Sequence, residues 1–175
     1  GPAGGFREGI QRALSRGGAD WIYVCEDDVV LLQLDRPLVG DLVERVEALH
    51  PGSPIDVAAV VAYGRKLDDR SGHTTPHHPG DADFVETDCA AWGCTLLNQN
   101  ALRALEVLPD DAMFFGYEDF DFFLHIGCLG GTVLLDGLTA RDAAAQVDAK
   151  GRTEQFRGQR PDDAAERAWR HYYAA

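Results

Sequence analysis

The amino-acid sequence predicts an α/β fold in which helices cover a largely parallel central sheet. Segments with apolar residues at helical spacing alternate along the chain with short, continuous apolar runs of strand length. Continuous apolar runs are typical of strands buried on both faces, as in parallel sheets covered by helices. A chain of 175 residues with 45% hydrophobic residues is long enough for one domain with a substantial core.

The first half of the chain is expected to contain two helices and two strands in alternation. The helices carry their apolar residues on one face, and Gly17 and Gly18 end the first of them. In chain order we expect a helix at 4–15, a strand at 21–25, a helix from Pro37 to residue 49 and a strand at 55–63.

The stretch 64–83 lacks periodicity and is rich in turn-forming residues, which predicts a long loop. Loops of this length are uncommon unless they are functional or disordered. The elements expected after it are a strand at 92–97, a helix from Asn98 through 107, a helix at 118–128, a strand at 132–135, an exposed polar segment at 142–160 and a terminal helix at 161–173.

Charge and hydropathy limit the classes of partner. The net charge of −13, with few lysines, argues against direct binding to nucleic-acid phosphates, which requires clustered cations. No apolar run approaches the roughly 18 to 20 residues of a membrane span, and the first residues have no signal-peptide character. The sequence therefore predicts a cytoplasmic protein without a transmembrane segment.

The cysteines and loop histidines offer two sites for zinc, but other interpretations are favoured. The four cysteines contain no CxxC pair, and we expect buried, reduced thiols rather than disulfides or a zinc site; they are Cys25, Cys89, Cys94 and Cys128. Three histidines lie in the expected loop, and an exposed polar loop is a commoner explanation than a metal site; they are His73, His77 and His78.

Three adjacent acidic residues, Glu26, Asp27 and Asp28, follow the predicted strand 21–25. In open α/β sheets, ligands bind at the carboxyl ends of strands. Successive strand residues point to opposite faces, so Glu26 and Asp28 can converge on one ligand. Their oxygen atoms suit Mg²⁺ or Mn²⁺. A solvated acidic turn is the alternative that these residues alone leave open.

A second acidic group opens the predicted helix 118–128. Glu118, Asp119 and Asp121 lie among phenylalanines, and removal of water raises a carboxyl pKa toward the range of a general base. The alternative is a charged first turn stabilised by the helix dipole. Glu118, Asp121 and His125 share one helix face, for which a solvated polar face is a commoner explanation than a metal site.

An aromatic residue next to a glycine, Trp92-Gly93, precedes the predicted strand in the second half. Such a ring either forms a wall against a sugar or fills the core. Core packing is the commoner of the two.

Four stretches, in this order and spacing, resemble family 2 glycosyltransferases of the GT-A fold, in the rhamnosyltransferase-like and galactofuranosyltransferase-like branch. They are GPAGGFREGI, WIYVCEDDVVL, AAWGCTLL and FFGYEDFDFFLHIGCLGG, with AWRHYYAA as a looser fifth. The resemblance covers nearly the whole chain. It implies a layered α/β/α fold with a largely parallel central sheet, N-terminally incomplete and lacking the first nucleotide-binding strand or strands. Residues 1–141 would be a partial catalytic domain, and 142–175 a polar C-terminal extension ending in a helix.

The resemblance also implies an activity. The chain would be an inverting, metal-dependent transferase that moves a sugar from a UDP- or dTDP-sugar to a hydroxyl of a glycan or glycolipid, as in cell wall or polysaccharide biosynthesis. Peripheral membrane association of the full-length protein is left open. The alternatives are a non-catalytic remnant or binding module of the same fold and, less favoured, a two-metal phosphohydrolase.

The implied residue roles fall into three groups. Asp119 would be the general base, with Glu118 beside it. Asp28 and Glu26 would hold Mg²⁺ or Mn²⁺ at the diphosphate. The implied donor-binding residues are Gly4, Gly5, Glu26, Asp27 and Arg141, and those of the acceptor or donor-sugar subsite are Trp92 and Gly93.

One departure from the family concerns Arg141 and Asp142. Relatives often have a histidine metal ligand shortly after the strand that corresponds to 132–135, where this chain has LTARD. Either Asp142 takes that role, or Arg141 contacts the diphosphate, or metal binding is weaker.

Overall fold

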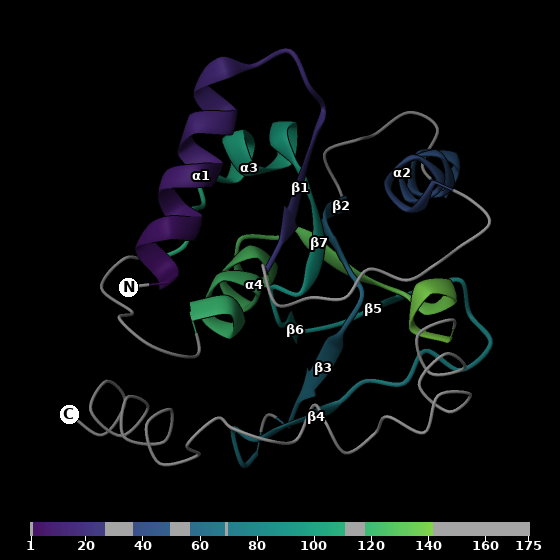
Figure 1. Ribbon diagram of the computed structural model, residues 1–175. Coiled ribbons are helices and arrows are strands. Elements are labelled where there is room, and N and C mark those ends of the chain that lie inside the picture. The colour runs from purple at the N-terminus through teal and green to yellow at the C-terminus, as the bar shows by residue number, and fades with distance from the viewer. Residues whose placement is uncertain (1, 27–36, 50–56, 69, 111–117, 142–175) are drawn as a thin grey trace.

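The structure, a computed structural model, describes residues 2–26, 37–49, 57–68, 70–110 and 118–141. These residues form a mixed α/β fold with two sheets (Figure 1). The helices are α1 (Pro2–Arg16), α2 (Leu38–Leu49), α3 (Gln99–Leu105) and α4 (Glu118–Cys128). The strands are β1 (Trp21–Cys25), β2 (Val57–Val61), β3 (Gly64–Leu67), β4 (Thr74–Pro76), β5 (Phe84–Glu86), β6 (Cys89–Ala90), β7 (Cys94–Asn98) and β8 (Thr132–Asp136).

The larger sheet has five strands in the order β1-β7-β2-β8-β5. β7 runs antiparallel to both β1 and β2, and β5 runs antiparallel to β8. Among the strand pairs that the structure describes in this sheet, β2 with β8 is the parallel one. The prediction of a largely parallel sheet, and of a GT-A core built on it, is therefore wrong. Apolar runs report burial on both faces, whereas strand direction depends on the connections between strands.

A smaller antiparallel sheet, in the order β4-β3-β6, lies beside the first. It corrects a second prediction, because β3 and β4 fall within the stretch 64–83 that was expected to be a loop. Gly64 begins β3 and contacts Thr87, whose Oγ1 would lie 2.6 Å from a Cβ at position 64. These strands are short and their side chains are mostly polar or half-exposed, so no hydrophobic alternation marks them in the sequence.

Helices cover both faces of the larger sheet (Figure 1). On one face, α1, α3 and α4 enclose the main core, which includes Ile10, Leu102 and Phe123. On the other face, α2 packs Leu42 and Val46 against the sheet. Neighbouring residues of β8 serve the two cores, because Val133 and Leu135 belong to the first and Leu134 to the second, which explains why all three positions are apolar.

The predicted helix ends agree closely with the structure. Gly17 and Gly18 follow α1 with φ of 62° and 79°, conformations that glycine adopts readily. Asn98 caps α3, because its side chain accepts hydrogen bonds from the backbone N–H groups of Asn100 and Ala101. None of the helices in the described segments is both long and apolar enough to cross a membrane.

Candidate functional site

The carboxyl ends of β1, β2 and β8 lie at the same end of the larger sheet, since these three strands run in the same direction. This follows from the pairing, because β1 and β2 both run antiparallel to β7, and β8 runs parallel to β2. Glu26 comes directly after β1, and its backbone N–H donates to the carbonyl oxygen of Gly93 at 3.2 Å. The structure therefore brings together two of the predicted site residues, Glu26 and Gly93.

Asp119 lies in the first turn of α4 and is half-buried. Burial raises the pKa of Asp119 to about 7 and outweighs the hydrogen bond from the backbone N–H of Phe120, at 2.8 Å, which lowers it. The negative charges of Glu118 and Glu26 raise the pKa further. The effect of Glu26 shows that the end of β1 and the start of α4 are electrostatic neighbours. A carboxyl group with this pKa can accept a proton near neutral pH.

Glu118 is almost fully buried, with 8% of its surface exposed. Its Oε2 atom has no hydrogen-bond partner among the residues that the structure describes. A buried carboxyl oxygen without a partner is costly, and a catalytic role is one reason for a protein to retain such a group. Glu118 lies next to Asp119 in the first turn of α4, and its negative charge raises the pKa of Asp119.

Trp92 is fully buried and belongs to the main core. Its ring stacks on Phe6 at a centroid distance of 4.7 Å and contacts Phe122 and Phe123 at 5.1 and 5.3 Å. In this position the ring offers no face to a sugar, which agrees with the core-packing alternative rather than with a subsite wall. The ring instead anchors the start of α4 through Phe122, close to Asp119.

The predicted metal site lies partly outside the described residues. Asp27, Asp28 and Asp142 are not among them, so Glu26 is the predicted ligand that the structure places. No group of three or more histidine, cysteine, aspartate or glutamate side chains suited to a metal ion occurs within the described segments. The described side chains alone therefore do not fit a complete Mg²⁺ or Mn²⁺ site, and we derive no chemical step through a metal.

Gly4 and Gly5 lie within α1, near its N-terminus. A Cβ atom at either position would meet no other atom within 4 Å, so the backbone there is open on one side. An open backbone is what a donor-binding role would need, and that role stays a prediction.

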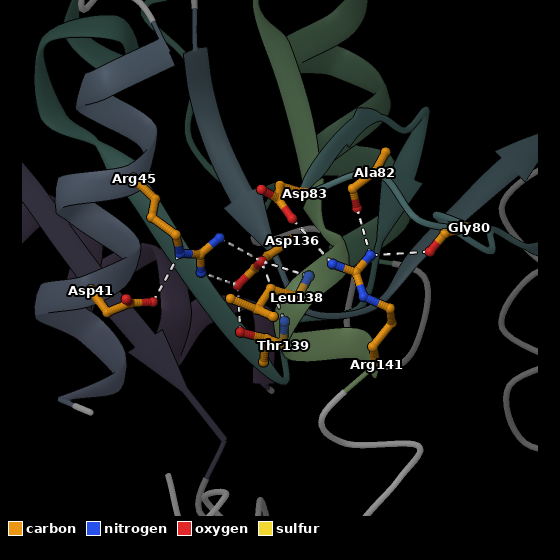
Figure 2. A network of polar contacts seen from close by, with 9 residues as sticks. All are labelled: Asp41, Arg45, Gly80, Ala82, Asp83, Asp136, Leu138, Thr139 and Arg141. Atoms are coloured by element: carbon orange, nitrogen blue, oxygen red, sulfur yellow. Dashed lines mark hydrogen bonds and ion pairs between the residues drawn. The ribbon is translucent and has the colours of Figure 1, made fainter. Parts of the chain in front are cut away.

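Arg141 binds protein groups in the segment just before β5 (Figure 2). Its guanidinium donates to the carbonyl oxygens of Gly80 and Ala82 at 3.0 and 2.8 Å and to Asp83 Oδ1 at 3.1 Å. Asp83 directly precedes β5, which lies at the opposite edge of the sheet from β1. These contacts attach the helical residues 137–141 to the preceding loop and occupy the guanidinium that the predicted role at the diphosphate would need.

Sequence reasoning missed Arg65 and Tyr63. Arg65 places its guanidinium 5.6 Å from the ring centre of Phe120, the residue after Asp119. Thr74 and the Tyr63 hydroxyl hold it through hydrogen bonds of 2.7 to 3.0 Å. Tyr63 is 46% exposed and lies just beyond β2, so its position as the last residue of the predicted strand 55–63 was the signal that could have identified it.

The structure changes the expectation for the cysteines. Cys89 is buried as predicted, but Cys25 and Cys128 are exposed and Cys94 is half-buried. All four are free thiols. Burial raises the pKa of Cys89 to about 11; the negative charge of Asp88 and, to a smaller extent, that of Asp119 raise it further, and Arg65 lowers it.

The raised pKa of Asp119 predicts a specific dependence of stability on pH. The folded state disfavours the ionised form of Asp119. Below about pH 4 this carboxyl is protonated in both the folded and the unfolded chain, so it does not lower the free energy of unfolding there. As pH rises from about 4 to 7, the unfolded chain ionises first and stability is lost, by about 2 to 4 kcal/mol in all. We therefore expect Asp119→Asn to be more stable than the wild type above pH 7 and similar to it below pH 4.

Urea unfolding at several pH values measures this difference. The matched control is Asp121→Asn, a change of the same kind on the same helix, which should retain the wild-type pH dependence. An Asp119→Asn protein whose stability falls with pH as steeply as the wild type would contradict the assignment.

Comparison with known proteins does not assign the chain to a family. No protein-family model matches the sequence, and no curated protein matches it significantly. The resemblance to family 2 glycosyltransferases therefore depends on the sequence motifs alone, and a function has to be argued from the residues of the site.

Proposed function

We propose that this chain is an inverting glycosyltransferase, related to family 2, that transfers a sugar from a nucleotide-diphosphate donor to a hydroxyl group. The observation that carries the proposal is Asp119, a half-buried carboxyl with a pKa of about 7 beside the carboxyl end of β1. Direct displacement at an anomeric carbon needs one base and no protein nucleophile, and Asp119 meets that requirement.

In the proposed step, an oxygen of Asp119 takes the proton of the acceptor hydroxyl. The hydroxyl oxygen forms a bond to the anomeric carbon, and the bond from that carbon to the nucleotide diphosphate breaks. The diphosphate leaves with the electron pair. A base with a pKa near the working pH is efficient in this role because it is both ionised and able to hold the proton.

The surroundings of Asp119 support an acceptor site. Tyr63 exposes an aromatic ring, and Arg65 provides a fixed cation over the ring of Phe120. Aromatic faces and fixed hydrogen-bond donors are suited to the mixed polar and apolar surface of a sugar. This supports a glycan or glycolipid acceptor bound on the Asp119 side of the site.

The donor is proposed to bind at the end of β1. A divalent cation, Mg²⁺ or Mn²⁺, would neutralise the diphosphate when bound there, with Asp28 and Glu26 as its predicted ligands. A cation at the diphosphate is especially needed in this chain, because a net charge of −13 repels an anionic donor. A cytoplasmic location, where nucleotide sugars are used, completes the proposal.

Isothermal titration with UDP and with dTDP, each with and without Mn²⁺, tests the donor site. We expect one of the two nucleotides to bind, and its binding to depend on Mn²⁺. Glu26→Gln should lower the affinity for that nucleotide by about 10- to 100-fold. The control is Glu47→Gln, an exposed carboxylate on α2 that accepts a hydrogen bond from Trp21 and should bind nucleotide normally.

Two other outcomes would replace the proposal. Nucleotide binding that is indifferent to Mn²⁺ and to Glu26→Gln, without sugar transfer, indicates a binding module. Consumption of the nucleotide itself indicates a phosphohydrolase.

A further inference from the structure

Cys25 and Cys94 lie directly opposite each other in the larger sheet. β1 and β7 are neighbours in the larger sheet (Figure 1). They pair antiparallel, and Cys25 is the register partner of Cys94 at the end of the ladder. The other two cysteines have no such relation, because Cys89 pairs with Arg65 in the smaller sheet and Cys128 ends α4. The geometry thus sets one cysteine pair apart from the rest.

The hydrogen-bond pattern identifies the type of strand pair. The next residues in the ladder, Glu26 and Gly93, are joined by a bond from the Glu26 N–H to the Gly93 carbonyl oxygen. Hydrogen-bonded and non-hydrogen-bonded pairs alternate along an antiparallel ladder, so Cys25 and Cys94 form a non-hydrogen-bonded pair. In such pairs the Cα atoms are about 4.5 Å apart and the side chains are closest.

This spacing suits a disulfide. Disulfides join Cα atoms about 4.4 to 6.8 Å apart, so the backbone of β1 and β7 already lies within the required range. As directly opposite residues of an antiparallel pair, Cys25 and Cys94 carry their side chains on the same face of the ladder. The Cys25 thiol donates to the carbonyl oxygen of Glu26 at 3.3 Å, and its pKa is raised by burial and by the neighbouring Cys94. Cys25 is exposed and Cys94 is half-buried, so a small reagent can reach the pair.

We propose that Cys25 and Cys94 are a redox-active pair that closes reversibly to a cross-strand disulfide between β1 and β7. The oxidant is a low-molecular-weight disulfide. The thiolate of one cysteine attacks it, forms a mixed disulfide and releases one small thiol; the second cysteine then attacks the mixed disulfide and releases the other. Two protein thiols are oxidised, and one small disulfide is reduced to two thiols. The bond forms one residue before Glu26, and its formation does not require the proposed transferase activity.

The test uses the whole purified chain, reduced and then incubated with oxidised glutathione under native conditions. We expect the loss of two free thiols per chain, a mass decrease equal to two hydrogen atoms, and one cross-linked peptide pair that contains Cys25 and Cys94. A dithiol reductant should restore the original mass.

Single variants separate this pair from general oxidation. Cys25→Ser and Cys94→Ser should each lose the intramolecular cross-link and retain a glutathione adduct on the remaining cysteine. Cys128→Ser, which removes the other exposed thiol, should form the cross-link as the wild type does. A wild-type chain that gives only glutathione adducts, or peptides cross-linked through Cys128, would overturn the proposal.

Discussion

Replacing Asp119 with asparagine is expected to lower turnover of sugar transfer by about 10²-fold or more while leaving donor affinity nearly unchanged. A general base acts in the transition state, so its removal lowers the rate without weakening ground-state binding. Asparagine has nearly the same shape and can still accept the hydrogen bond from the backbone N–H of Phe120. The loss therefore reports the missing base rather than a collapsed site.

The pH dependence of turnover distinguishes this role from a structural one. Wild-type turnover should rise with pH, reach about half of its maximum near pH 7 and level off about one pH unit higher, as Asp119 ionises. The residual activity of Asp119→Asn should lack that rise, and Asp121→Asn should keep it. Retention of more than about a tenth of turnover by Asp119→Asn would assign the base to another residue.

Replacing Asp136 with alanine is expected to destabilise the protein by about 3 to 5 kcal/mol. Asp136 is 1% exposed and accepts two hydrogen bonds from the guanidinium of Arg45, at 3.0 and 2.9 Å (Figure 2). It also accepts hydrogen bonds from the backbone N–H groups of Leu138 and Thr139 and from the Thr139 hydroxyl. Alanine would leave the half-buried Arg45 with Asp41 as its remaining partner in this network and would remove the cap of the following helical turn.

The matched control for Asp136 is Asp83→Ala, which breaks the exposed ion pair between Asp83 and Arg141 in Figure 2. The Asp83 side chain is 71% exposed, and its bond to Arg141 should contribute no more than about 1 kcal/mol, because water screens and replaces it. Urea unfolding at neutral pH measures both variants. Equal losses of stability in Asp136→Ala and Asp83→Ala would show that the contribution of these aspartates does not depend on their burial.

The two predicted effects have opposite consequences for stability. Asp136 is a buried carboxylate with a full set of partners, so its removal costs folding energy. Asp119 is a carboxylate whose charge the folded state disfavours, so its removal should stabilise the protein above pH 7 while strongly lowering the proposed activity.

Much of the candidate site could be identified before the structure. Glu26 follows an apolar strand and Asp119 opens an amphipathic helix, and both positions are local features of the sequence. Arg65 and Tyr63 could not be joined to them, because their proximity to Phe120 depends on the smaller sheet packing against α4. The burial that raises the pKa of Asp119 is likewise a property of the packed site.

The sequence by itself determined the helices and the apolar strands. Residues 21–25, 118–128 and the cap at Asn98 agree with β1, α4 and the start of α3, because spacing, capping and apolar runs act over a few neighbouring residues. Only the tertiary structure decided the direction of β7 and β5, the burial of Trp92 and the pairing of Cys25 with Cys94. Each of these depends on contacts between residues far apart in the chain, and no local pattern specifies which distant segment a strand or a ring will meet.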